Sequence, residues 1–132
     1  RETKRVNLVC HNDFNQHNII TAQDRTFVVN FDYCGIELNL LDIAGLIKHT
    51  LRECGWQVDN AKAVVESYGS VEKLSEDEIE IIKIMLLFPQ KFWRAANRYY
   101  NGKPSWMGAN YTERLKEAVN ETLAQEDLFG NW

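Results

Sequence analysis

Apolar residues follow two different spacings along this chain of 132 residues. Over residues 6–35 they form short β-prone runs separated by polar loops, and over residues 39–125 they recur at the spacing of helices. The pattern predicts an α+β protein that is mostly helical, with a small β-hairpin region near its start. The length suits a single hydrophobic core, and no repeat or Gly/Ser linker divides the sequence.

The β-prone part predicts short strands around one polar loop. The runs at residues 18–21 and 27–31 are joined by a polar turn at residues 22–25, which is typical of a hairpin. An irregular polar loop at residues 11–17 separates this hairpin from a first strand at residues 6–10. The loop is therefore expected to begin where one strand ends and to finish where the next one starts.

The helical part carries start and stop signals. Asn39 is expected to cap the first helix, and Gly55 to end it in a left-handed conformation. Ser75 and Glu78 form a capping box ahead of a segment that is apolar nearly all round, which predicts a buried helix. Pro89 then kinks this helix or starts a new one. The predicted helices span residues 40–54, 59 or 60 to 69, 75–88, 90–101 and 111–125.

Composition and charge exclude several classes of protein. The formal net charge of −4 argues against a nucleic-acid partner, because nucleic-acid-binding proteins usually carry a basic balance. No apolar run reaches the roughly 18 residues that span a bilayer, so no membrane segment is expected. The three cysteines lack Cys-x-x-Cys spacing and are expected to be reduced and mostly buried, as in an intracellular protein. The chain begins at Arg1 without Met and reads as a piece of a longer protein.

The most informative segment carries the pattern His-x-Asp-x-x-x-x-Asn from His11 to Asn18. Phosphoryl transfer needs a carboxylate that takes the proton of the acceptor hydroxyl, and Asp13 is placed to act as this catalytic base. An Asn oxygen can ligate magnesium without adding a full negative charge beside the phosphates, which suits Asn18 as a metal ligand. His11 is expected to brace the loop by hydrogen bonds, whereas Asn15 and His17 are expected to be solvated.

Three later residues extend the candidate site. Asn30 and Asp32 lie two positions apart, so on a strand they project to one face and can offer an oxygen ligand for magnesium to the loop. An equally weighted alternative is that Asp32 accepts hydrogen bonds within a turn. Asp42 lies in the first turn of the next predicted helix and is placed to brace the loop by accepting its backbone amides. No set of residues identifies the substrate-binding site, which stays unknown.

This constellation resembles the Brenner-type loop, His-Gly-Asp-x-x-x-x-Asn, of aminoglycoside phosphotransferases and choline kinases, which share a two-lobed fold with protein kinases. The resemblance implies ATP and Mg²⁺ as cofactors, Asp13 as the catalytic base and Asn18 as a magnesium ligand. It places Asn30 where the following strand usually holds a metal-binding Asp, and Asp42 where a structural Asp braces the loop. Asn12 stands where that family usually has Gly.

Residues 29–33 and 88–101 resemble more closely the spore-coat kinase-like (CotS-type) proteins of endospore-forming bacteria, and this resemblance covers nearly the whole chain. It implies the C-terminal lobe of a kinase-like domain, with the catalytic-type loop and β-hairpin in residues 1–35 and a helical subdomain in residues 36–132. The Gly-rich loop and phosphate-binding Lys of the N-terminal lobe are not in this sequence. The piece alone is therefore not expected to transfer phosphate.

Two functions from different classes follow from the resemblance. The first is phosphoryl transfer from ATP to a small hydroxyl-bearing molecule, with the protein's own N-terminal lobe as a partner. The second is a non-catalytic, pseudokinase-like structural or assembly role among spore-coat proteins. Asp13 and Asn18 favour the enzyme, whereas Asn30 favours the second role because a neutral amide is a weaker magnesium ligand than a carboxylate. The expected location is the bacterial cytoplasm or the spore coat.

The predicted helix at residues 90–101 carries two sets of side chains with open roles. Lys91, Arg94 and Arg98 share one face, and a solvated face is favoured over contact with an anionic partner. The aromatic side chains in and after this helix are expected to pack the core of the lobe rather than bind a ligand. This aromatic set comprises Phe92, Trp93, Tyr99, Tyr100 and Trp106.

Overall fold

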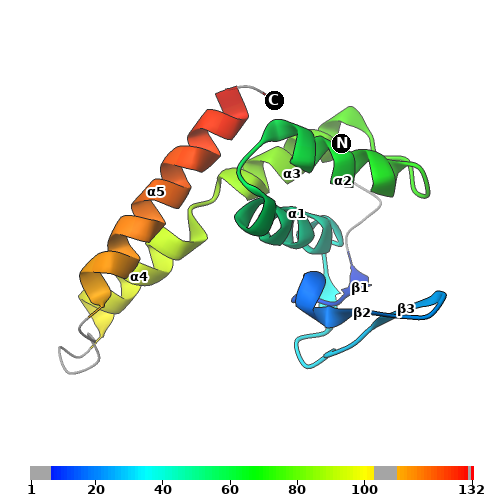
Figure 1. Cartoon of the computed structure of the whole chain (residues 1–132), viewed down its shortest axis with the longest axis horizontal. Coiled ribbons are helices and arrows are strands. Elements are labelled where there is room, and N and C mark those ends of the chain that lie inside the picture. The colour runs from blue at the N-terminus through cyan, green and yellow to red at the C-terminus, as the bar shows by residue number, and fades with distance from the viewer. Residues whose placement is uncertain (1–6, 103–109, 131) are drawn as a thin grey trace. The chain divides into compact units, whose positions relative to one another are not determined.

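The computed structural model of the chain describes residues 7–102, 110–130 and 132. It confirms a mostly helical α+β architecture with a small β-hairpin region (Figure 1). These residues form two compact units that divide between Leu86 and Leu87, and each unit is described separately. Trp106, which belongs to the predicted aromatic set, lies outside the described residues.

The first unit begins with two small antiparallel sheets. The predicted hairpin is confirmed, because β2 (Ile19–Ala22) pairs with β3 (Arg25–Val28). A strand that the sequence did not predict, β4 (Gly35–Glu37), pairs with β1 (Leu8–Cys10). The paired residues of this second sheet are Leu8 with Glu37, Val9 with Ile36, and Cys10 with Gly35. The pairing of β1 with β4 brings together the two ends of the segment that contains the polar loop, the hairpin and the turn after the hairpin.

The predicted strand at residues 27–31 is wrong in its second half. β3 covers only the first part of this range, and the chain then turns at Asn30, which has a left-handed φ of 67°. The turn is stabilised from the polar loop, since the Val29 N–H donates to the Asn18 carbonyl at 3.0 Å. Asn30 and Asp32 therefore do not project from one face of a strand, which was the basis for pairing them.

Helix α1 (Leu40–Cys54) has the predicted bounds, but both of its ends differ from the prediction. The Asn39 cap is wrong, because Asn39 has helical backbone angles and its Nδ2 donates to the Tyr68 hydroxyl at 3.4 Å. Gly55 does have a positive φ of 96°, but its ψ of 150° is extended rather than helical. Helix α2 (Val58–Gly69) begins one or two residues before the predicted start at residue 59 or 60.

Helix α3 (Glu76–Leu87) starts at the predicted capping box. The Ser75 N–H donates to the Glu78 carboxylate at 2.9 Å, and the Glu78 N–H donates to the Ser75 hydroxyl at 3.2 Å. The prediction of burial all round is wrong, because Ile84 is 60% exposed and Phe88, just after the helix, is 52% exposed. Only one face of α3 is covered by the described part of this chain.

Fully buried aliphatic side chains of α1 and α3 form the core of the first unit. Such burial contributes about 1.5–3 kcal/mol for each side chain relative to full exposure. The residues are Leu40, Ile47 and Leu51 of α1, and Ile82 and Leu86 of α3. This core fixes α1 in place, and the first turn of α1 is the part of the helix that meets the polar loop.

The second unit is a pair of helices, α4 (Gln90–Asn101) and α5 (Tyr111–Gly130), that lie side by side (Figure 1). Pro89 occupies the cap position ahead of α4, so it separates α4 from α3 rather than kinking one long helix. The predicted end of the last helix at residue 125 is wrong, because α5 continues to Gly130.

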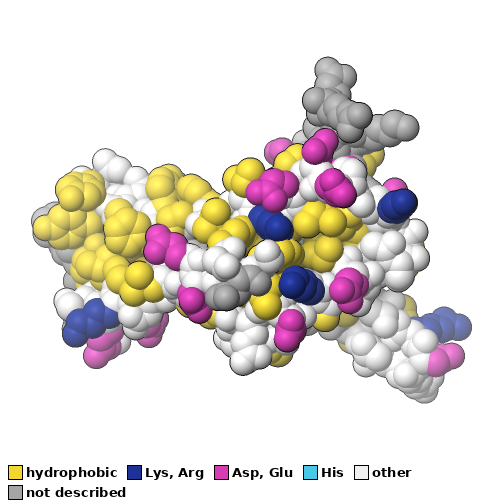
Figure 2. Space-filling model, turned by 90° about the horizontal axis from the view of Figure 1, so that it is seen from above, with side chains coloured by type: hydrophobic (Ala, Val, Ile, Leu, Met, Phe, Trp, Pro, Cys, Tyr) yellow, Lys and Arg dark blue, Asp and Glu magenta, His cyan; other side chains and the backbone are white. Residues whose placement is uncertain are grey.

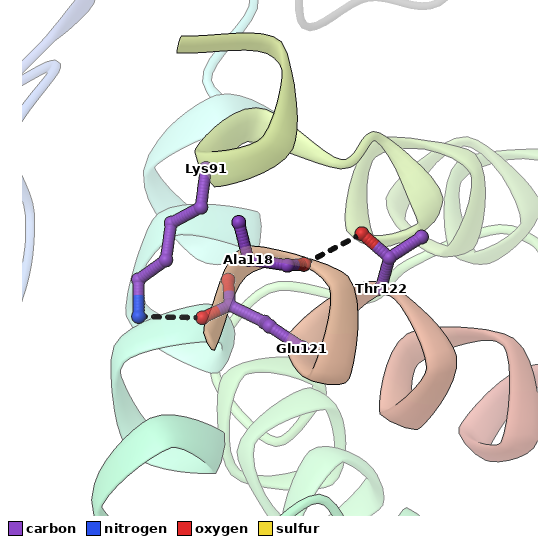
Figure 3. A network of polar contacts seen from close by, with 4 residues as sticks. All are labelled: Lys91, Ala118, Glu121 and Thr122. Atoms are coloured by element: carbon purple, nitrogen blue, oxygen red, sulfur yellow. Dashed lines mark hydrogen bonds and ion pairs between the residues drawn. The ribbon is translucent and has the colours of Figure 1, made fainter. Parts of the chain in front are cut away.

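Helix α4 has no buried residue, so its aromatic side chains do not form the predicted core. Trp93 is 53% and Tyr100 80% exposed, and Figure 2 shows hydrophobic side chains gathered at the α4–α5 end of the chain. Lys91, Arg94 and Arg98 are exposed, as predicted, and Lys91 Nζ also lies 2.7 Å from Glu121 Oε2 (Figure 3). Glu121 is nearly buried, so this ion pair joins the two helices.

The cysteines also depart from the prediction. All three are free thiols, but only Cys10 is buried, whereas Cys34 and Cys54 are exposed. Among the helices of the described residues, none combines the length and apolar character needed to cross a membrane.

Candidate functional site

Residues 11–18 form a compact polar loop between β1 and β2. Its last residues make a short 3₁₀ turn, η1 (Gln16–Asn18). Asn15 caps this turn, because its side-chain oxygen accepts the His17 N–H at 2.9 Å. The prediction that both residues are solvated holds for His17, which is exposed, and is wrong for Asn15, which is buried.

Asp42 holds the beginning of this loop. Its carboxylate accepts the backbone N–H of His11 at 2.7 Å and that of Asn12 at 2.8 Å. Hydrogen bonds to a charged group are each worth about 1.5–3 kcal/mol, so Asp42 ties the loop firmly to α1. Asn12 has a left-handed φ of 61°, a conformation that Asn tolerates, and its side chain donates to the Tyr33 carbonyl at 3.0 Å.

His11 is buried, and both of its ring nitrogens are engaged. Nδ1 lies 3.2 Å from the Asp13 N–H nitrogen, and Nε2 lies 2.8 Å from the Val29 carbonyl oxygen. A backbone N–H can only donate and a carbonyl can only accept, so this network assigns a neutral ring with its proton on Nε2. The ring also packs against Phe31 and Phe14, at 4.8 and 5.9 Å between centroids. His11 is thus arranged to brace the loop, with no nitrogen left for proton transfer.

The Asp13 carboxylate is half-buried and accepts two side-chain amides. Asn15 donates to Oδ1 at 3.1 Å, and Asn18 donates to Oδ2 at 2.9 Å. Both amides also donate to the Asp13 carbonyl, at 2.9 and 2.8 Å respectively. The sequence did not reveal the part played by Asn15. The sequence signal for its capping role was the residue type, because an Asn side chain in a loop commonly accepts the backbone N–H of the residue two positions later, as in an Asx turn.

The amide oxygen of Asn18 lies against a second amide. Asn30 Nδ2 donates to this oxygen at 3.2 Å. Asn18 is buried, with 7% of its surface exposed, whereas Asn30 is exposed on the turn after β3. The structure therefore brings these two predicted magnesium ligands together, but with an NH₂ group between their oxygens.

Asp32 lies outside this network. It is exposed on a turn, and within the described part of the chain it forms no hydrogen bond with the loop. The described residues also contain no group of three or more His, Cys, Asp or Glu side chains that could hold a metal ion. Magnesium prefers converging oxygens held at short distances. As arranged, Asn18, Asn30 and Asp32 do not fit such an ion.

His11 and Asp42 also line a groove of about 880 Å³ in the first unit. Most of its wall is apolar and comes from the loop, α1 and α2, with Phe14, Leu46 and Val64 among the lining residues. This volume lies in the range of small-molecule pockets. No sequence motif predicted the groove, because its wall is assembled from several elements that are separate in the sequence.

Two groups close to the loop have shifted pKa values. Burial raises the pKa of the Cys10 thiol, and the negative charge of Asp42 raises it further. Burial lowers the pKa of His49 on α1, and the positive charge of Arg52 lowers it further. At neutral pH the first is therefore an uncharged thiol and the second an uncharged imidazole.

Comparison with known proteins places the chain among the kinase-like proteins of bacterial spore coats. Over residues 1–132 it matches the family described as "Spore coat putative kinase YutH", and the chain belongs to this family. It is also 23% identical over 122 residues to Spore coat protein S of Bacillus subtilis (strain 168), which covers 91% of this chain and 35% of that protein. The chain thus spans about a third of the length of this curated relative. No solved structure matches.

Proposed function

We propose that this chain is the C-terminal lobe of an aminoglycoside phosphotransferase-like fold that serves as a non-catalytic, structural or assembly component of the bacterial spore coat. Membership of the spore-coat family supports the location and the coat partners. The Asp42 brace and the contacts between Asp13 and Asn18 support the kinase-like fold, because they hold side by side the two residues that match its catalytic-type loop. An N-terminal lobe completes the fold in the longer protein.

The observation that supports a non-catalytic role is the position of Asp32, the one charged residue among the three candidate magnesium ligands. Phosphotransferases neutralise the transferred phosphate with metal ions held by carboxylate and amide oxygens. Asn18 and Asn30 are both neutral here, and Asp32, whose carboxylate was the candidate to compensate, is exposed outside their network. A site without a converging carboxylate holds magnesium weakly.

Asp13 supports a second candidate function, which is transfer of a phosphoryl group from ATP to a small hydroxyl-bearing molecule. Its half-buried carboxylate is held by two amides, which is the fixed geometry that a catalytic base needs. The groove lined by His11 and Asp42 offers space beside the loop that carries Asp13. In this case ATP and Mg²⁺ are the cofactors, and the N-terminal lobe supplies the residues that hold the phosphates.

Coat assembly and ATP turnover in the full-length protein separate the two candidates. Asp13→Asn removes the carboxylate, and Asp24→Asn at the exposed hairpin turn is a matched control. The non-catalytic role predicts that both variants reach the coat as the wild type does. It also predicts that the wild type consumes no more ATP with Mg²⁺ than Asp13→Asn does. ATP consumption that only Asp13→Asn abolishes, in a protein that still folds, supports the phosphotransferase instead.

A further inference from the structure

The orientation of the Asn18 amide is determined by Asp13. Within reach of the Asn18 side chain, Asp13 presents a main-chain carbonyl oxygen and a carboxylate oxygen, at 2.8 and 2.9 Å. Both atoms can only accept hydrogen bonds while the carboxyl group is ionised. The group of Asn18 that faces them must therefore be its NH₂ group, and its oxygen must point the other way.

The oxygen of Asn18 points at residue 30, so residue 30 must offer a donor. Asn30 does so through Nδ2 at 3.2 Å, and an oxygen at that place would set two acceptors against each other. The backbone keeps the two side chains close, because the Val29 N–H donates to the Asn18 carbonyl at 3.0 Å. The left-handed φ of 67° at Asn30 is one that Asn and Asp adopt more readily than most residues.

A carboxylate at position 30 could not donate a hydrogen bond to the Asn18 oxygen. The Asn18 oxygen and the carboxylate oxygens would then face each other as acceptors, and a cation between them would satisfy both. Because Asn18 is buried, its oxygen cannot turn freely to water. The amide of Asn30 removes this need, because it supplies the positive end of an N–H dipole where a cation would otherwise lie.

We infer that the side-chain amide of Asn30 takes the place of a divalent cation, so that the hydrogen bonds of the loop are complete without metal. The single substitution Asn30→Asp is then expected to create a cation-binding site. The inference deepens the proposed non-catalytic role, on which it rests, by naming the group that replaces the cation. Polar contacts run without a break from Asp13 through Asn18 to Asn30, and each one joins a donor to an acceptor. The loop therefore keeps its shape in the absence of any ligand.

The test uses the full-length protein without nucleotide, with Mn²⁺ as the probe. Thermal unfolding is followed in EDTA and in millimolar Mn²⁺, and Mn²⁺ binding is measured by calorimetric titration. The wild type is expected to have the same Tm under both conditions and to give no saturable heat. Asn30→Asp is expected to lower the Tm by a few degrees in EDTA, to recover most of that loss in Mn²⁺, and to give a saturable binding heat.

Asn7→Asp is the matched control for this variant. Asn7 is exposed and has a left-handed φ of 61°, close to the 67° of Asn30. The Asn7→Asp variant therefore measures the change in Tm that an Asp causes in that backbone conformation, without altering the Asn18 contact. Two results overturn the inference. One is a Mn²⁺ response of the wild type as large as that of Asn30→Asp, and the other is an Asn30→Asp variant that behaves like Asn7→Asp.

A measurement on the wild type alone decides the matter if Asn30→Asp fails to fold. The Asn30 side-chain N–H proton that is donated to Asn18 is expected to exchange slowly with solvent in EDTA, as a hydrogen-bonded proton does, in an NMR experiment on the labelled protein. Exchange as fast as that of the exposed Asn7 amide overturns the inference. Failure of the proposed function is a separate result, namely ATP turnover that depends on Asp13. An Asn30→Asp variant that ignores Mn²⁺ leaves the proposed function standing.

Discussion

The polar loop at residues 11–18 and the α4–α5 helix pair are stabilised by different means. In the loop, carboxylate and amide side chains form hydrogen bonds with backbone groups and with one another. The carboxylate of Asp42, on α1, accepts two backbone N–H groups of the loop. In the helix pair, the polar contacts between helices include the Lys91–Glu121 ion pair and a bond from the Tyr111 hydroxyl to the Ala95 carbonyl at 3.0 Å. Much of the aromatic surface of α4 stays exposed.

This difference indicates that side-chain positions are closely determined in the loop and less closely in the helix pair. Directional hydrogen bonds converge on Asp13, so a change to one partner is expected to move or release the carboxylate. The helix pair relies on side-chain packing together with contacts such as the Lys91–Glu121 ion pair and the Tyr111–Ala95 hydrogen bond, so single changes there should remain local. Substitutions in the two regions can test this contrast directly, and the largest effect should come from the loop.

Asp42→Ala should produce the largest loss of stability. It removes two hydrogen bonds to a charged group and leaves the N–H groups of His11 and Asn12 without their acceptor, at a cost of about 3 kcal/mol in the free energy of unfolding. Asp59→Ala is the control, because Asp59 also lies in the first turn of a helix but is exposed. Urea unfolding of both variants measures the difference, and equal costs would contradict the bracing role of Asp42.

Lys91→Met tests the helix pair. Glu121 is 7% exposed and Lys91 46%, so the change leaves a nearly buried carboxylate without this cation (Figure 3). We expect a cost of about 1–2 kcal/mol, between the values for exposed and buried ion pairs. Lys116→Met, at an exposed position of α5, should cost much less. A double-mutant cycle with Glu121→Gln isolates the pair, and a coupling energy near zero would show that the pair does not stabilise the unit.

Asn15→Ala and Asn15→Asp separate the two contacts of Asn15. Asp keeps an oxygen that can accept the His17 N–H, but it replaces the NH₂ group that donates to Asp13 with a second acceptor. If the contact with Asp13 matters, both variants lose about 1 kcal/mol in the free energy of unfolding. If only the cap matters, Asn15→Asp is as stable as the wild type, which would remove Asn15 from the account of the site.

The smallest expected effect is a pH dependence from His49. Burial lowers the pKa of this side chain in the folded protein, so the unfolded chain binds the proton more readily. Its contribution to stability is therefore complete above the ordinary His pKa of about 6.5 and is lost as the pH falls below that value. His49→Gln should flatten this part of the pH profile of unfolding, with His17→Gln as the exposed control. An unchanged slope in His49→Gln would rule out the effect.

The sequence predicted the local features of the fold well. The bounds of α1 and α4 match the prediction, and the β2–β3 hairpin and the Ser75–Glu78 capping box follow from signals carried by neighbouring residues. The hydrogen bonds from the loop to Asp42 were also expected, from the position of Asp42 in the first turn of the predicted helix and from the resemblance to phosphotransferases.

The features that the sequence did not reveal depend on distant partners. β4 has only three residues and forms because β1 is available as its partner. The run at residues 27–31 is β-prone, but its pairing ends with Val28 opposite Ile19 and the Val29–Asn18 bond, and the chain then turns at Asn30. The exposure of the α4 aromatic residues likewise depends on what covers the helix, which its own amphipathic pattern does not specify.

The most direct test of the central claim, that this loop is complete without a divalent cation, is a calorimetric titration of Mg-ATP into the full-length protein. We predict that Mg²⁺ makes no difference to the heat of nucleotide addition, in the wild type and in an Asp32→Asn variant alike. Magnesium-dependent binding that Asp32→Asn weakens would contradict the claim. That result would show that Asp32 takes up the role of metal ligand that Asn30 does not fill.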